Sequence, residues 1–293
     1  MKLRYSADYK TLAYMFVTTA LFIVQWQLDK FNIALYIWCL FMAVSVAVIA
    51  HNHNHLSIWK NKTLNILTDY WLTLFYGFPV FAWIPTHNKN HHRLNNREGD
   101  YTITYRVSEK NNLFTLLIYP SISGYYQQKA INAYLKEIKT KDKEKYFLCL
   151  SQYLILILFI GAGLIIDWQK ALLYIIIPQQ FSLYVVMIFN YVQHVHADEE
   201  SKYNHSRNFV GFLNAMLFNN GYHTIHHDKA GLHWSVTPAA HKEIEHLIDD
   251  SLNERSMTWF MLKNYIFGIF MPSLKTQSMR LERLTQEQLA PNS

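Results

Sequence analysis

The sequence is poor in charge and almost free of cysteine. Only 16% of its 293 residues are charged, against about 25% in a typical soluble domain. This deficit argues against an ordinary cytosolic enzyme, and the 51% apolar content argues against disorder. The two cysteines, Cys39 and Cys149, lie in apolar runs and cannot supply a disulfide framework, an iron–sulfur cluster or a zinc site of paired cysteines. Histidine, in contrast, occurs fifteen times.

Four long runs contain no Asp, Glu, Lys, Arg or His: 11–28, 31–50, 146–166 and 171–193. A helix needs about 20 mainly apolar residues to cross a bilayer, and each run is close to that length. Short charged segments, 29–30 and 167–170, separate the members of each pair. The pattern predicts two membrane-crossing helical hairpins. Four buried helices of a large soluble core are the alternative.

The basic residues suggest an orientation in the membrane. If both hairpin turns face outward, only Lys30 and Lys170 of the 27 basic residues lie outside. Because cytoplasmic flanks carry the excess of Lys and Arg, we expect both termini and most polar sequence in the cytoplasm. The net charge of +6 then needs no nucleic-acid partner, because positive-inside bias and anionic lipid heads account for it.

Shorter apolar stretches at 70–84 and 113–126 are interrupted by Gly77, Pro79, Pro120 and Gly124. We interpret them as interfacial or re-entrant segments, since a model with six spans would place 51–68 and 87–112 on opposite sides of the membrane. The Lys-rich stretch 136–145 is expected to be a solvated helix, and 257–271 another interfacial helix. The first apolar run lacks a small-residue cleavage site and is expected to be a span rather than a signal peptide. The predicted fold is therefore an all-α integral membrane protein of one domain, 1–293, with four transmembrane helices and a cytoplasmic helical cap, 51–145 and 194–293.

The histidines gather in clusters next to the predicted spans. On a helix, residues three and four apart share a face, so we expect two or three imidazoles of each cluster to converge on one point. All clusters are predicted on the cytoplasmic side, and together they indicate a shared metal site. Its candidate ligands are His51 and His55; His87, His91 and His92; Asn190 and His194; and His223, His226 and His227.

The number and type of ligands restrict the metal. Zinc is satisfied by three or four ligands, blue copper sites use cysteine and methionine, and calcium and magnesium prefer oxygen. Nine imidazoles therefore indicate more than one ion with open positions, and two irons that handle O₂ fit best. Zinc hydrolysis is the competing interpretation, but the sequence has no HExxH motif.

These motifs resemble the three histidine boxes of the integral-membrane fatty acyl desaturase and hydroxylase superfamily. The boxes are His51-x3-His55, His87-x3-His91-His92 and His223-x2-His226-His227, and Asn190-x3-His194 is similar to the extra pair of the stearoyl-CoA desaturase branch. The resemblance implies a di-iron enzyme that inserts a double bond into an acyl chain, acyl-thioester or acyl-lipid, using O₂ and an external donor such as ferredoxin or cytochrome b5 with its reductase. The nine histidines would bind the two irons, Asn190 would act through water, and the division between the irons is not readable.

Other reactions on this scaffold stay open. The first box has three residues between its histidines, where animal acyl-CoA desaturases have four, and His53 lies between them. Gln193 replaces the acid of a similar element in alkane hydroxylases. The alternatives are a hydroxylase or other oxygenase, an alkene-forming fatty-acid decarboxylase, and a non-catalytic membrane metal-binding or transport protein.

Six histidines are not assigned as ligands, and we expect most of them to support the ligands or lie at the surface. Asp100, Asp228, and Asp198 or Glu199, are candidates to hold the second nitrogen of a ligating imidazole. The six are His53, His196, His205, His233, His241 and His246.

Overall fold

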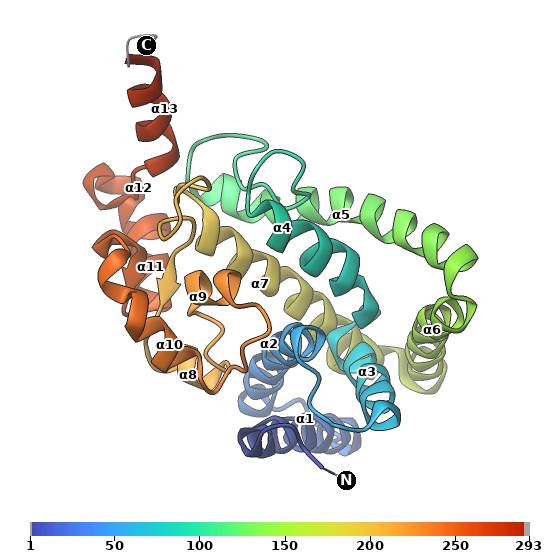
Figure 1. The fold of residues 1–293 in the computed structure, drawn as a ribbon. Coiled ribbons are helices and arrows are strands. Elements are labelled where there is room, and N and C mark those ends of the chain that lie inside the picture. Colours follow the sequence, from blue (N-terminus) through green and yellow to red (C-terminus); the bar gives the residue numbers. More distant parts are fainter. Residues whose placement is uncertain (1, 290–293) are drawn as a thin grey trace. The chain divides into compact units, whose positions relative to one another are not determined.

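The structure is a computed structural model that describes residues 2–289, and it is mostly helical (Figure 1). This confirms the all-α class. The α-helices are α1 Tyr9–Gln27, α2 Ile33–His55, α3 Lys62–Tyr76, α4 His92–Leu94, α5 Leu113–Lys141, α6 Lys143–Ala171, α7 Ile177–His194, α8 Phe212–Met216, α9 His223–Asp228, α10 Thr237–Ile244, α11 Met257–Met261, α12 Gly268–Phe270 and α13 Met279–Leu289. π-Helical segments cover Ile84–His91, Leu172–Ile176 and Leu262–Phe267, and the strands are β1 Asn208–Phe209 and β2 Asn253–Glu254.

The described residues divide into two compact units. The first consists of residues 2–88 and 128–186, and the second of residues 89–127 and 187–289. Three helical segments, Ile84–His91, α5 and α7, contribute residues to both units. The single domain predicted for 1–293 stays a prediction, and its outermost residues, 1 and 290–293, lie outside the described part.

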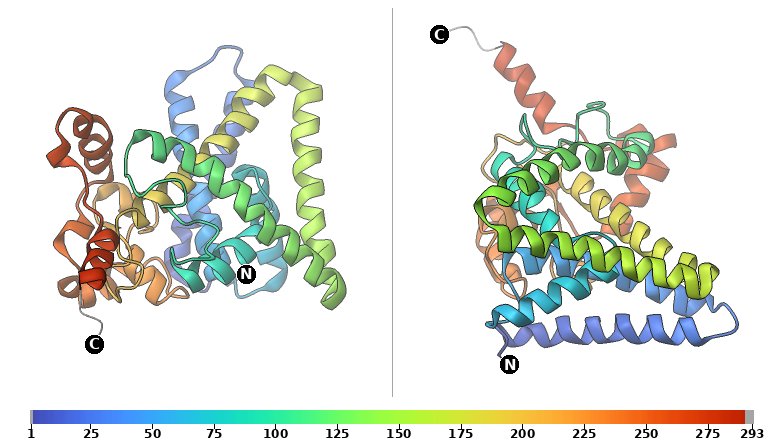
Figure 2. Two further views of the ribbon diagram at one scale, coloured as in Figure 1. Left: turned by 90° about the horizontal axis from the view of Figure 1, so that it is seen from above. Right: turned by 90° about the vertical axis from the view of Figure 1, so that its right-hand side faces the viewer.

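Helices cover nearly all of the four uncharged runs, the last of which continues from the first unit into the second. Helices α1 and α2 form one hairpin, and α6 packs against the segment Leu172–Ile176 to form another (Figure 2). The second turn occurs at Asp167, whose backbone is extended and whose Oδ1 accepts bonds from the amides of Gln169 and Lys170. Two helical stretches, Ile33–His55 and Lys143–His194, are long and apolar enough to cross a membrane.

Helix α2 is the centre of the first unit. Every residue from Met42 to His51 is buried, which is unusual for one helix and requires neighbours on all sides. Helices α1 and α3 pack on it. Outward-facing positions of α1 and α6 are apolar as well, since Phe16 and Ile165 are 73% and 87% exposed.

The stretch 70–84 does not form one segment. Helix α3 ends at Tyr76, and Gly77 adopts a left-handed conformation, φ +84°, that stops it. A Cβ atom at Gly77 would lie 2.4 Å from the Cβ of Gln179. Gln179 donates to the carbonyl of Leu74 at 2.7 Å and so satisfies the end of α3.

The interruption predicted within 113–126 is wrong. Helix α5 runs unbroken from Leu113 to Lys141, with Pro120 inside it. Asn112 caps its start, since Asn112 Oδ1 accepts a bond from the Thr115 amide at 3.0 Å. One face of the helix is buried along its length, including Tyr119, Ile131 and Ile138, and we attribute the continuity to this packing.

The second unit is built around the end of α7. Tyr191 and Val192 pack with Phe209 of β1 and with Phe260 of α11. Strands β1 and β2 pair in parallel, with Asn208 opposite Asn253. The expected helix at 257–271 is present as α11, Leu262–Phe267 and α12. The core of this unit therefore lies directly beside the residue that ends α7, His194.

Candidate metal centre

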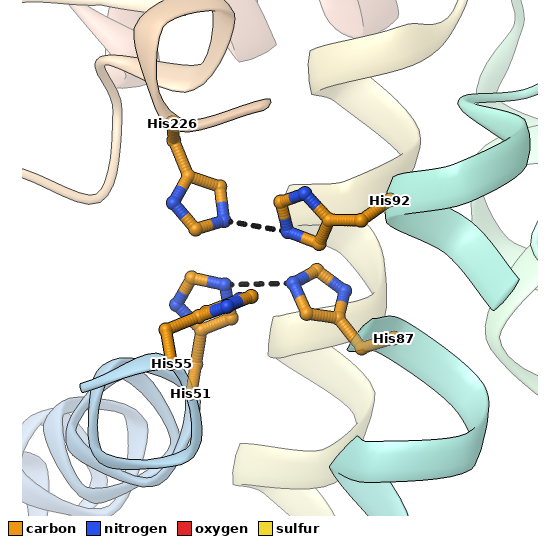
Figure 3. A group of neighbouring side chains, drawn as sticks. All are labelled: His51, His55, His87, His92 and His226. Carbon is orange, nitrogen blue, oxygen red and sulfur yellow. Dashed lines mark hydrogen bonds between the residues drawn. The ribbon is translucent and has the colours of Figure 1, made fainter. Parts of the chain in front are cut away.

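The last turn of α2 carries the first histidine pair. His51 and His55 are four residues apart, and their ring centroids are 4.8 Å apart. His87 of the segment Ile84–His91 faces them, with 2.9 Å between the Nε2 atoms of His51 and His87 (Figure 3). His51 and His87 are buried. These three imidazoles form the histidine group of the first unit.

The proton of His51 can be placed from its neighbour. The Nδ1 atom lies 3.2 Å from Asn52 Oδ1, and because an amide oxygen only accepts, Nδ1 must carry the proton. Nε2 then holds the lone pair and points toward the group. Trp83 packs edge-on against the rings of His51 and His87, at 5.3 and 5.2 Å between centroids, and shields this side from water.

The second unit brings four other histidines together. One ring nitrogen from each lies within 4.8 Å of the others. The Nε2 atom of His223 is 2.8 Å from that of His194 and 3.2 Å from that of His227. His91 and His194 are completely buried. We call His91, His194, His223 and His227 the four-histidine group.

Asp100 fixes the orientation of His91 within this group. Its Oδ2 lies 2.8 Å from His91 Nδ1, and neither side chain is exposed to solvent. Burial alone would raise the pKa of Asp100, but attraction to the His91 ring and hydrogen bonds from His91 and Thr102 outweigh it and lower that pKa. The ionised carboxylate keeps the proton on Nδ1, so Nε2 is the nitrogen that can bind a metal. The expectation for Asp100 is confirmed.

The ring of His194 is held in place by the segment between α7 and β1. Its Nδ1 lies 3.2 Å from the carbonyl oxygen of His205, which again directs Nε2 toward the group. Arg207 is buried and donates to the carbonyls of Val192 and Val195 at 2.9 and 3.1 Å, which satisfies the last turn of α7. No motif marked His205 or Arg207, because a carbonyl group or a buried cap can come from many residue types.

The buried rings near this group favour the neutral form. Burial and the nearby imidazoles of His92 and His223 lower the pKa of His227. Burial and the charge of Arg97 lower the pKa of His205 to about 4. Neutral imidazole is the form that binds metal ions.

His92 and His226 face each other, with 3.0 Å between their Nε2 atoms (Figure 3). Two boxes are divided, although two imidazoles of the third, His223 and His227, do converge as expected. In the second, His91 belongs to the four-histidine group whereas the adjacent His92 faces His226. In the third, His226 is not a member of the group that contains His223 and His227.

His53 and His196 belong to neither histidine group. His53 lies 3.4 Å from Asp69 and accepts a bond from the Ile58 amide. His196 has a left-handed backbone, φ +64°, and its ring nitrogens lie against the carbonyls of Glu109 and Thr276. Both have structural contacts in place of metal-directed ones.

The expectation for Asp198 and Glu199 is wrong. Instead of holding an imidazole, their carboxylates pair with arginines of α13. Asp198 accepts a bond from Arg283 at 2.7 Å, and Glu199 pairs with both Arg280 and Arg283. The sequence did not indicate that the end of the chain returns to the loop after His194.

Asn190 lies one turn before His194 on α7 and so shares its face. Its Nδ2 donates to the hydroxyl of Tyr119 at 2.6 Å, and that hydroxyl donates to the Thr102 carbonyl at 2.8 Å. Burial raises the pKa of Tyr119. Tyr119 and Thr102 carry no motif, and sequence reasoning missed both.

The donor sets fit metal ions. Within residues 2–289, the groups with ligand spacing contain histidine and no carboxylate or cysteine. Buried neutral imidazoles with lone pairs directed to one point suit borderline metals such as iron and zinc. A family model for fatty acid desaturases matches residues 31–259. The chain belongs to the fatty acid desaturase family.

Membership in this family makes the protein an oxidoreductase of a membrane-bound class. The matched range contains all the histidine boxes, and it begins after α1 and ends within α11. Comparison with curated proteins and with solved structures found no match.

Proposed function

We propose that the protein is an O₂-dependent, non-haem di-iron fatty acyl desaturase that introduces a double bond into a long acyl chain. The observation that carries the proposal is the buried four-histidine group in a chain of the desaturase family. Two irons bound by neutral imidazoles would supply an oxidant able to take hydrogen from an unactivated C–H bond. The substrate would be an acyl-thioester or an acyl-lipid.

The ligands follow from the grouping of the histidines. His91, His194, His223 and His227 would hold one iron. The other residues of the predicted ligand set stay as the sequence predicts them, with Asn190 acting through water. These are His51, His55, His87, His92 and His226.

The membrane arrangement is part of the proposal. The four helical runs would cross the bilayer as two hairpins, with both termini and the metal centre in the cytoplasm. The exposed apolar side chains of α1 and α6 support it, because lipid would cover them. Cysteines introduced at Lys30 and Lys110 test the orientation, since only the first should react with an impermeant thiol reagent applied outside.

The reaction also defines what must come from elsewhere. Desaturation removes two hydrogen atoms from the chain, and reduction of O₂ to two waters takes two further electrons and two protons. An external ferredoxin-like or cytochrome b5-like donor with its reductase would supply the electrons. Burial of each CH₂ is worth about 0.8 kcal/mol, so an apolar tunnel can bind the chain tightly and set the position of the double bond.

Lipid analysis after expression in a defined host tests the proposal. Mass spectrometry of fatty-acid methyl esters should show a new double bond with the wild type and none with His91→Ala or His226→Ala. His246→Ala is the matched control, since His246 is exposed and belongs to neither histidine group. An added oxygen would indicate a hydroxylase, and a shortened terminal alkene a decarboxylase. Unchanged lipids together with fewer than about two irons per chain would refute the proposed enzymatic function.

A further inference from the structure

The hydroxyl of Tyr119 bonds the Thr102 carbonyl, the Asn190 amide and the Ser123 hydroxyl, and the chemistry of the first two fixes the direction of their bonds. Tyr119 is buried on α5, 2.8 Å from the Thr102 carbonyl oxygen and 2.6 Å from Asn190 Nδ2. A carbonyl oxygen only accepts, so the single hydroxyl proton must go to Thr102. The hydroxyl oxygen therefore accepts from Asn190.

This bond decides which way the Asn190 amide faces. With Nδ2 bound to Tyr119, the carbonyl oxygen Oδ1 is the terminal atom left for other partners. Asn190 and His194 share one face of α7. A water on a metal ion donates its protons, so it needs an acceptor, and only the amide oxygen offers one. The reverse orientation would present an NH₂ group and repel such a water.

Thr102 links this orientation to that of His91. Its carbonyl accepts from Tyr119, while its hydroxyl lies 2.8 Å from His91 Nδ1 and donates to Asp100 at 2.7 Å. Thr102 therefore contacts both the Tyr119 hydroxyl, which orients the Asn190 amide, and the ring of His91 in the four-histidine group. Neighbouring packing keeps the arrangement in place.

That packing is a second contact between α5 and α7. The ring centroids of Tyr119 and Tyr191 lie 4.9 Å apart, and the Tyr191 hydroxyl donates to Thr115 at 2.9 Å. Tyr191 and Thr115 are also buried. Because both tyrosines are locked by packing, the Tyr119 hydroxyl stays where it is and the amide must adapt to it.

We propose that Tyr119 is a positioning residue, which holds the Asn190 amide with its carbonyl oxygen toward the metal-binding face and connects it through Thr102 to His91. The inference rests on the proposed di-iron function. It assigns a role to a residue outside the histidine boxes, and the role concerns orientation, since Tyr119 itself would not touch the metal.

Mössbauer spectroscopy of the iron-loaded protein in detergent tests this role without relying on turnover. Tyr119→Phe keeps the ring and removes the bond to Asn190. We expect it to retain its iron but to change the spectrum of one of the two irons, as Asn190→Ala should. The double variant should show no change beyond that of Asn190→Ala alone, because both substitutions act on one water-mediated contact.

Tyr191→Phe is the matched control. It removes a second buried tyrosine hydroxyl from the same helix contact, but that hydroxyl bonds Thr115 and has no link to Asn190. We expect the wild-type spectrum. The proposal is overturned if Tyr119→Phe also gives the wild-type spectrum, if its effect adds to that of Asn190→Ala, or if Tyr191→Phe changes the spectrum equally.

Three further results keep the outcome decisive. If Tyr119→Phe does not fold, a fluorinated tyrosine at position 119 keeps the hydroxyl and alters only the strength of its hydrogen bonds, and an unchanged spectrum then counts against the role. If the wild type binds iron and desaturates lipids while Tyr119→Phe gives the wild-type spectrum, the positioning role fails and the proposed function stands. If the wild type binds no iron, both fail.

Discussion

Replacement of Asp100 by asparagine should be severe, and the reason lies in its four hydrogen bonds. Oδ1 accepts from the amide and the hydroxyl of Thr102, both at 2.7 Å, and Oδ2 accepts from the Asn96 amide and His91 Nδ1, both at 2.8 Å. Each oxygen thus faces a backbone N–H, which cannot reverse. Whichever way the new amide is turned, its NH₂ group meets a backbone donor.

The magnitude follows from burial. Asp100 and His91 are both inaccessible to solvent, and leaving buried donors without their charged acceptor costs about 3 kcal/mol or more. For a chain of this size each kcal/mol lowers the unfolding temperature by about 2–4 °C, so Asp100→Asn should lower it by at least about 6 °C. Loss of the carboxylate that orients a ligating histidine should also weaken metal binding by about 10–100-fold.

Two measurements on purified protein in detergent check this reasoning. Thermal unfolding followed by circular dichroism gives the stability, and retention of iron against a competing chelator gives the affinity. Asp69→Asn is the control, because Asp69 also faces a histidine, His53, but at 3.4 Å and with its side chain 30% exposed. It should cost less than about 1 kcal/mol. Equal effects of the two substitutions, or an Asp100→Asn protein as stable as the wild type, would refute the argument.

Three further outcomes are expected. Arg283→Ala should destabilise the protein by about 1–3 kcal/mol, because it removes a partner of the buried Glu199, while Lys141→Ala, at an exposed pair, should have little effect on the unfolding temperature. Burial lowers the pKa of His205 to about 4, so its neutral ring contributes to the free energy of unfolding above the unfolded pKa of about 6.5. This contribution, about 3 kcal/mol in all, is lost as pH falls from 6.5 toward 4. His205→Asn should flatten this part of a stability–pH profile measured without metal. Chelation should lower the unfolding temperature of the wild type by several degrees more than that of His223→Ala. The wild type loses a bound ion that stabilises its folded state, whereas the variant has lost a ligand for that ion. Equal shifts would count against the metal site.

Some helices were predictable because their cause is local. The runs at 31–50 and 146–166 are apolar on every side, and helices α2 and α6 cover them. Pro120 and Gly124 predict an interruption of α5, because both residues have low helix propensity. The helix is continuous, since burial of Leu116, Tyr119 and Ile131 stabilises it. Tertiary packing outweighed the preference of single residues.

The site divides in the same way. Helical spacing predicted that His51 and His55 share a face, because both stand on one turn of one helix. It could not separate His91 from His92 or His223 from His226, since their partners come from distant segments. Nor could it find Thr102, Tyr119 or the α13 arginines, whose roles depend on hydrogen bonds between residues far apart in the chain.

By itself, the sequence determined the helical class of the protein and the histidines that could hold a metal. Charge-free runs and helically spaced histidines are local patterns, and the periodicity of the helix is enough to interpret them. The tertiary structure decided which imidazoles face each other, which nitrogen of His91 carries the proton, and which way the Asn190 amide is turned. Those properties depend on the direction of individual hydrogen bonds, and only folding brings the two ends of each bond together.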